Sequence, residues 1–146
     1  MISSLKQRGM MLIEGLLAIL IFSMGILAVV GLQAASVKNS ADAKYRADAS
    51  FLANQIIGAM WADQANLATY AHNPTGVPCA PIPPASGNAT VNAWLADIAQ
   101  ALPNADAGLQ QISISPTNVV TVSVCWQGPS EPAPHMYTAI AQISPN

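Results

Sequence analysis

The chain has 146 residues, of which 52% are hydrophobic and only 8% are charged. Because a soluble globular protein carries about 25% charged residues, this composition excludes an ordinary cytosolic enzyme. Five Lys and Arg residues against seven Asp and Glu provide no basic surface, which excludes a nucleic-acid-binding protein. The two cysteines and two histidines form neither a Cys-x-x-Cys nor a His-x-x-x-His pair, so we predict no metal site and no cofactor.

The two halves of the chain differ in proline content. All eleven prolines lie between Pro74 and Pro145. Since proline breaks helices, the first half can form one continuous helix and the second half cannot. We therefore divide the chain near the Asn73-Pro74 pair, which favours a turn, and expect residues 72–146 to form a C-terminal domain.

The N-terminal segment is apolar over a long stretch. Residues 1–9 are polar, and the residues that follow are apolar except for Glu14. The uncharged run Gly15–Val37 exceeds the about 20 residues with which a helix spans a bilayer. We therefore predict a membrane-spanning helix over residues 10–37.

The helical pattern continues beyond this run. Over residues 38–71, apolar residues recur at intervals of three and four, or multiples of them, and predict one buried stripe: Tyr45, Ala49, Leu52, Ile56, Met60 and Leu67. We predict a single helix from about Met10 to about Tyr70, with an amphipathic second half.

Glu14 is the unusual residue of the apolar segment, because a carboxylate among apolar residues is costly and usually has a functional partner. The stretch Lys6-Gln7-Arg8-Gly9-Met10-Met11-Leu12-Ile13-Glu14 resembles the class III signal of type IV pilins. The resemblance implies that a prepilin peptidase cuts after Gly9 and that the new N-terminus, Met10, is methylated. It also implies that Glu14 pairs with the terminal amine of an adjacent subunit during assembly.

Within that family, the stretch from Leu12 to Leu27 is similar to minor pilins of the PilV type, the type IV pilus modification proteins. Met10 departs from the phenylalanine with which the mature chain usually begins. Major pilins usually have a proline in the membrane half of the helix, whereas this chain has Gly25 and Gly31 there. The resemblance therefore favours a minor subunit over the bulk subunit of the filament.

The implied function is assembly rather than catalysis, and we find no residue arrangement typical of an enzyme. A minor pilin contributes to initiation of the pilus and to its tip complex. Its implied partners are other minor pilins, the major pilin, the prepilin peptidase, the inner-membrane assembly platform, a tip adhesin and, before assembly, membrane lipid. The implied location is a single-pass protein of the inner membrane with a periplasmic C-terminal domain, and then the pilus at the cell surface.

Two alternatives remain open. Minor pseudopilins of type II secretion systems share the N-terminal signature, and neighbouring genes would distinguish them. A membrane-anchored periplasmic binding module would instead retain residues 1–9.

The C-terminal domain is expected to be a small α+β unit of the type IV pilin kind. Thr90 or Asn92 is a candidate cap for a helix that ends at Pro103. Alternating or apolar residues then predict three strands, at 109–115, 119–127 and 135–143. The simplest arrangement is an antiparallel sheet whose Val/Trp face packs on the second half of the long helix.

The remaining side chains receive structural interpretations. Cys79 and Cys125 are an even pair in a domain expected to be periplasmic, which predicts a disulfide. Cys125 has the opposite parity to the Val/Trp face, so the proline-rich loop should be attached to the outer face or edge of the sheet. His72 and His135 are expected at the surface or in loops, and the three tryptophans, Trp61, Trp94 and Trp126, in the core.

Overall fold

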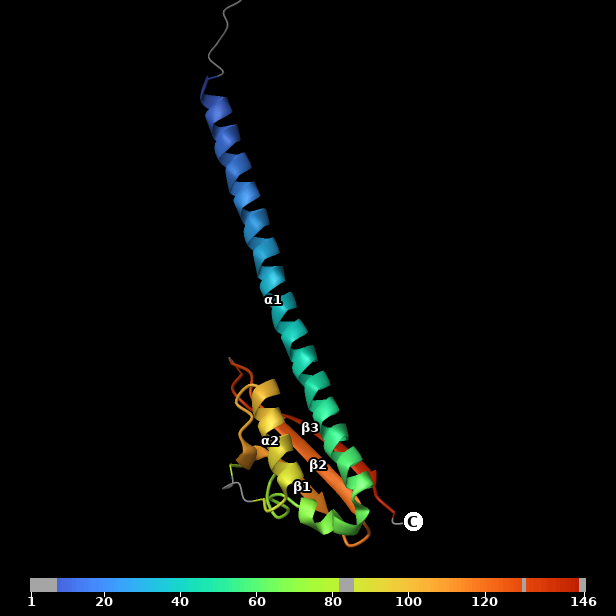
Figure 1. Cartoon of the computed structure of the whole chain (residues 1–146). Coiled ribbons are helices and arrows are strands. Elements are labelled where there is room, and N and C mark those ends of the chain that lie inside the picture. Colours follow the sequence, from blue (N-terminus) through green and yellow to red (C-terminus); the bar gives the residue numbers. More distant parts are fainter. Residues whose placement is uncertain (1–7, 82–85, 130, 145–146) are drawn as a thin grey trace, which may run out of the picture. The chain divides into compact units, whose positions relative to one another are not determined.

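The computed structural model describes residues 8–81, 86–129 and 131–144. Its α-helices are α1 (Arg8–Ala62) and α2 (Ala89–Ala101), and two 3-10 helices cover Gln64–Tyr70 and Ala107–Leu109. The strands are β1 (Gln111–Ile114), β2 (Val119–Trp126) and β3 (His135–Gln142). They form an antiparallel sheet in the order β1-β2-β3, so that β2 lies in the middle (Figure 1). The chain is thus α+β, with two compact units, one ending at Ala41 and one beginning at Asp42.

Within the second unit, α1 buries the predicted stripe. Ala49, Leu52, Ile56 and Met60 are at most 5% exposed, and they belong to one core with residues of α2 and the sheet. Figure 1 shows this part of α1 beside α2 and the sheet. Trp61 lies outside this stripe and is 45% exposed, so its assignment to the core was wrong. Trp94 and Trp126 are buried as expected. Position on the helix, rather than hydrophobicity alone, therefore decides which side chains of α1 are covered.

The α-helix ends at Ala62 rather than near Tyr70. Asp63 has a non-helical backbone, and its main-chain carbonyl and its carboxylate accept hydrogen bonds from the main-chain N–H and the side-chain amide of Asn66. Short polar side chains compete in this way with the helical hydrogen bonds. The chain continues as the 3-10 helix, which still buries Leu67 and Tyr70.

Asn88 caps α2, in place of the predicted Thr90 or Asn92. Its Oδ1 accepts hydrogen bonds from the main-chain N–H groups of Thr90 and Val91, at 2.8 and 3.3 Å. These bonds satisfy two donors at the helix start that have no partner inside the helix. The buried indole of Trp94 donates to the Leu52 carbonyl of α1 at 2.9 Å, which fixes α2 against that part of α1.

The three strands lie within the predicted ranges and show the predicted parity. On the inner face Val120, Val122, Val124 and Trp126 are at most 2% exposed. Ser115 and Asn118 close the β1–β2 turn, since the Asn118 N–H donates to the Ser115 carbonyl at 3.0 Å. The alternation of side chains along β2 therefore identified the core face correctly.

His72 closes the outer edge of β1. Its main-chain N–H and carbonyl exchange hydrogen bonds with Ile112, at 3.0 and 2.8 Å. The imidazole is fully buried, and its Nε2 lies 3.0 Å from the carbonyl oxygen of Ala107. His72 thus lies in a loop, as one of the two predicted positions, but not at the surface, because contacts with distant residues bury it.

The side chain of Gln110 extends β1 by one position. Its Oε1 accepts from the Cys125 N–H at 2.8 Å, and its Nε2 donates to the Cys125 carbonyl at 3.0 Å. Both residues are completely buried. A side-chain amide thus replaces the backbone partner that Cys125 would otherwise need.

We predict that Gln110→Ala lowers the free energy of unfolding by about 1–3 kcal/mol, because it leaves buried main-chain groups of Cys125 without partners. Urea unfolding of the full chain in detergent, followed by tryptophan fluorescence, measures this loss. Gln100→Ala, at an exposed position of α2, is the matched control. Equal losses in the two variants would contradict the role of Gln110.

Candidate functional site

The apolar part of α1 is the most unusual surface of the chain. Every residue from Met10 to Ser40 is exposed, including large apolar side chains such as Phe22 at 70% and Leu27 at 71%. By length and composition the helix is sufficient to cross a membrane, and none of its most apolar window is buried. An apolar surface of this extent requires a covering of lipid or protein.

Glu14 lies on this surface near the start of α1. Its side chain is exposed, and no other described residue forms a hydrogen bond or ion pair with it. Arg8, Gly9 and Met10 lie in the same helix, whereas residues 1–7 of the expected leader fall outside the described residues. The structure therefore places Gly9, Met10 and Glu14 within the first turns of one helix.

Three glycines leave gaps among the exposed apolar side chains of this helix. Around Gly25 the exposed surface of the helix is formed by Phe22, Val29 and Gln33, among others. A Cβ atom added at Gly15, Gly25 or Gly31 would meet nothing within 4 Å. Ser23 donates its hydroxyl to the Ile19 carbonyl at 2.7 Å, so its polar group is satisfied inside the helix. Such positions allow another helix to approach closely.

Cys79 and Cys125 are joined in a disulfide, as the sequence predicted. Cys125 lies in the central strand and points away from the Val/Trp face. The loop around Cys79 is also held by Gln111, whose Nε2 donates to the carbonyls of Asn73 and Gly76, at 2.9 and 3.1 Å. Covalent and polar contacts therefore attach this loop to the sheet, although residues 82–85 fall outside the description.

A groove between α1 and α2 lies inside the second unit. It encloses about 440 Å³ and is lined by Phe51 and Leu52 of α1 and by Asp97 and Ala101 of α2, among others. Lys44 and Asp48 at its border form an ion pair at 3.0 Å. No pattern in the sequence indicated this groove, because it depends on how the two helices pack.

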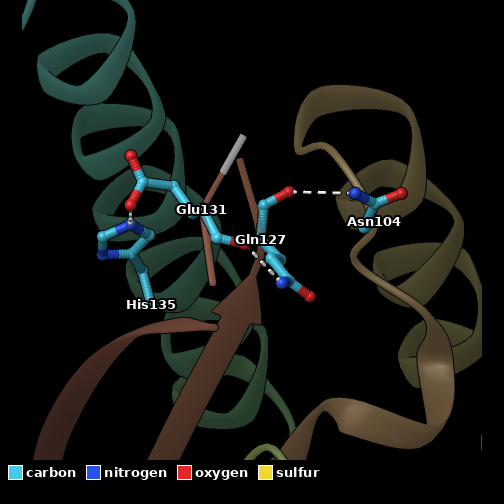
Figure 2. A network of polar contacts seen from close by, with 4 residues as sticks. All are labelled: Asn104, Gln127, Glu131 and His135. Carbon is cyan, nitrogen blue, oxygen red and sulfur yellow. Dashed lines mark hydrogen bonds and ion pairs between the residues drawn. The ribbon is translucent and has the colours of Figure 1, made fainter. Parts of the chain in front are cut away.

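A polar network holds the connection from β2 to β3 (Figure 2). Gln127 donates its Nε2 to the Glu131 carbonyl at 2.7 Å, and its own carbonyl accepts from Asn104 Nδ2 at 3.1 Å. The Glu131 carboxylate lies 4.0 Å from Nε2 of His135, whose ring stacks on Trp126. These contacts fix the start of β3.

Over residues 8–81, 86–129 and 131–144, no group of three or more His, Cys, Asp or Glu side chains is arranged to hold a metal ion. In comparisons with protein-family models, with curated proteins and with solved structures, nothing matches this chain. The apolar segment over residues 10–37, in which Glu14 is the one carboxylate, is therefore the surface that most distinguishes this chain.

We predict that thiol alkylation under denaturing conditions labels neither cysteine until a reductant is added, and then labels both. The double variant Cys79→Ser/Cys125→Ser should lower the free energy of unfolding by about 4 kcal/mol, from loop-closure entropy over a sequence separation of 46. Intact mass and urea unfolding measure the two effects. Two labelled thiols without reductant would show that the disulfide is absent.

Proposed function

We propose that this chain is a minor pilin of the type IV pilus. It is made as a precursor in the inner membrane, cleaved after Gly9 and methylated at Met10, and then assembled through residues 10–37. In the pilus it contributes to initiation and to the tip complex, with a pilin-like C-terminal domain in the periplasm and later at the cell surface. The observation that carries the proposal is Glu14, a single carboxylate on an exposed apolar helix, five residues after Gly9.

Assembly resolves the energetic problem that Glu14 poses. Burying an isolated carboxylate among apolar groups costs much free energy, whereas burying it together with an opposite charge costs much less. Cleavage after Gly9 would create an ammonium group at Met10. When apolar helices pack side by side, the ammonium of one subunit and the Glu14 carboxylate of its neighbour neutralise each other.

Helix geometry sets the offset between the two neighbours. Met10 and Glu14 are four residues apart, which corresponds to about 6 Å along an α-helix. The terminal amine of one subunit therefore reaches the carboxylate of another when the two helices are displaced by about one turn. A charge pair of this kind selects one axial register, which the apolar side chains alone specify poorly.

The remaining features of α1 support packing among similar helices. The exposed apolar side chains need a covering throughout the life of the protein, first from lipid and then from neighbouring subunits. The gap at Gly25 permits a close approach of helix backbones. The C-terminal domain, which has its own core and disulfide, is then available to select partners among the other pilins and a tip adhesin.

The first test concerns processing. Intact mass and N-terminal sequencing of the membrane form should find a chain that begins at a methylated Met10. Gly9→Val should block cleavage, because it places a branched side chain next to the bond that is cut, whereas Gly15→Val should be processed normally. A wild-type chain that retains residues 1–9 would contradict the proposal and favour a membrane-anchored binding module.

The second test concerns assembly. In a piliated cell, Glu14→Ala should still insert and be cleaved, but its amount in sheared pili should fall about 100-fold or more, since removing one partner of a buried ion pair costs about 3–5 kcal/mol. Asn39→Ala is the matched control, because it removes an exposed polar group from the same helix, outside residues 10–37, without removing a charge. Immunoblots of the membrane and pilus fractions measure the ratio. Normal incorporation of Glu14→Ala would exclude the charge pair.

A further inference from the structure

The groove between α1 and α2 extends over several helical turns. The part bordered by Lys44 and Phe51 continues into a second recess, because both parts are lined by Gln55 and Asp97. Along the groove the residue numbers rise on α1 and fall on α2, so the two helices run antiparallel there (Figure 1). Its α1 wall runs from Lys44 to Ala59, which corresponds to about 22 Å along a helix. The groove is therefore long enough to receive about four turns of another helix.

The groove has an apolar floor and mixed borders. Its buried lining residues, Leu52, Ile56 and Trp94, are at most 5% exposed and form the floor. The ring of Phe51 at the border is 68% exposed. The exposed polar side chains of the lining are those of Gln55, Asp97 and Gln100. An occupant therefore meets apolar surface below and acceptor groups beside it.

This construction suits a helix better than an extended segment. The main chains of both walls are helical and form their hydrogen bonds within α1 and α2, and the indole N–H of Trp94 already donates to the Leu52 carbonyl. An extended segment would therefore bury its own main-chain groups without partners, whereas a helix satisfies them internally. Small side chains on both walls leave room for such a helix: Ala59, Ala93 and Ala101.

Asp97 indicates the charge of the occupant. Its side chain is exposed in the middle of the groove, and no described residue forms a hydrogen bond or ion pair with it. The other acid of the lining, Asp48, has Lys44 as its partner at 3.0 Å. The sequence contains no Lys or Arg after Arg46, and Arg46 lines a different recess with Asp42. A helix that covered the floor would take Asp97 partly out of water and would have to supply the cation itself.

We propose that the α1–α2 groove binds a helix of another protein that presents an arginine among apolar or small residues. The arginine pairs with Asp97, and the residues around it cover the floor. The second unit, residues 42–146, has two basic and six acidic residues and therefore a net charge of −4, which favours approach of a basic partner. The proposal concerns this unit alone and is independent of the proposed function.

An arginine matches each part of the lining. Its methylene groups cover apolar surface such as Leu52, and its planar guanidinium donates to the Asp97 carboxylate. The side-chain carbonyls of Gln55 and Gln100 accept its remaining N–H groups. The exposed ring of Phe51 offers a face on which a guanidinium stacks. Lysine has three donors and no planar group, so it satisfies fewer of these contacts.

Other occupants match the groove less well. A second copy would have to supply its cation from Lys44 or Arg46, of which Lys44 is paired with Asp48 and Arg46 lies in a recess with Asp42. Anionic lipid headgroups would be repelled by Asp97. A purely apolar helix would cover the floor but leave Asp97 without a partner. A basic helix meets both requirements.

Binding of a designed peptide to the full chain in detergent tests the charge requirement. The probe is a labelled, water-soluble helical peptide of about 16 residues with alanine and leucine on one side and one central arginine. Fluorescence anisotropy should show that it binds at least about fivefold more tightly than the same peptide with glutamine in place of arginine. Asp97→Asn should remove this preference. Asp106→Asn is the matched control, since it neutralises an exposed acid outside the groove, and it should keep the preference.

Equal binding of the two peptides to the wild-type chain, or equal effects of the two Asn variants, would overturn the proposal. So would dimers of the chain that the arginine peptide dissociates, because they would assign the groove to a second copy. Analytical ultracentrifugation detects such dimers.

Charge reversal and removal of the ring test the placement of the arginine. Asp97→Lys should reverse the order of affinity, so that a peptide with a central glutamate binds more tightly than the arginine peptide. Phe51→Ala should weaken binding of the arginine peptide, whereas Ile140→Ala, which removes a 69% exposed apolar side chain from β3, should not. An unchanged order of affinity in Asp97→Lys would overturn the proposal.

Discussion

The rest of the structure depends on one helix that meets two environments. In its second half, α1 buries one stripe against α2 and the sheet, which is what a surface helix of a globular domain does. In its first half, apolar side chains are exposed on all sides and one of the residues among them is a glutamate. How stable this first half is therefore depends on the lipid or the other chains that cover its apolar side chains. The second half provides the core that the C-terminal domain needs in order to fold.

Much of the fold could be predicted from patterns that repeat along the sequence. The buried stripe of α1 and the inner face of β2 follow from strict periodicity, which is independent of distant residues. The residue that caps α2 was harder to predict. Asn88, Thr90 and Asn92 all have side chains suited to capping, and only the backbone at the helix start selects Asn88. The end of α1 similarly depends on how Asp63 and Asn66 bond to each other.

The burial of certain polar side chains depends on distant residues and could not be predicted. His72 is buried because its main chain pairs with Ile112 and its ring contacts Ala107. Gln110 is buried because its side chain forms hydrogen bonds with the main chain of Cys125. Nothing in the local sequence distinguishes these residues from polar side chains of a loop. Of the candidate site, Glu14 was visible in the sequence because a charge within an apolar run stands out, whereas the groove between α1 and α2 requires the packed structure.

The disulfide has a mechanical consequence. Cys79 and Cys125 enclose α2, β1 and nearly all of β2 in one covalent ring, with a sequence separation of 46. When tension is applied between α1 and the end of β3, the force passes through the disulfide and does not extend the chain within the ring. At about 3.4 Å per residue, the chain inside the ring would extend by on the order of 150 Å if the disulfide were absent. The domain therefore unravels under load only through the segments outside the ring, whereas α2, β1 and nearly all of β2 are shielded from stretching.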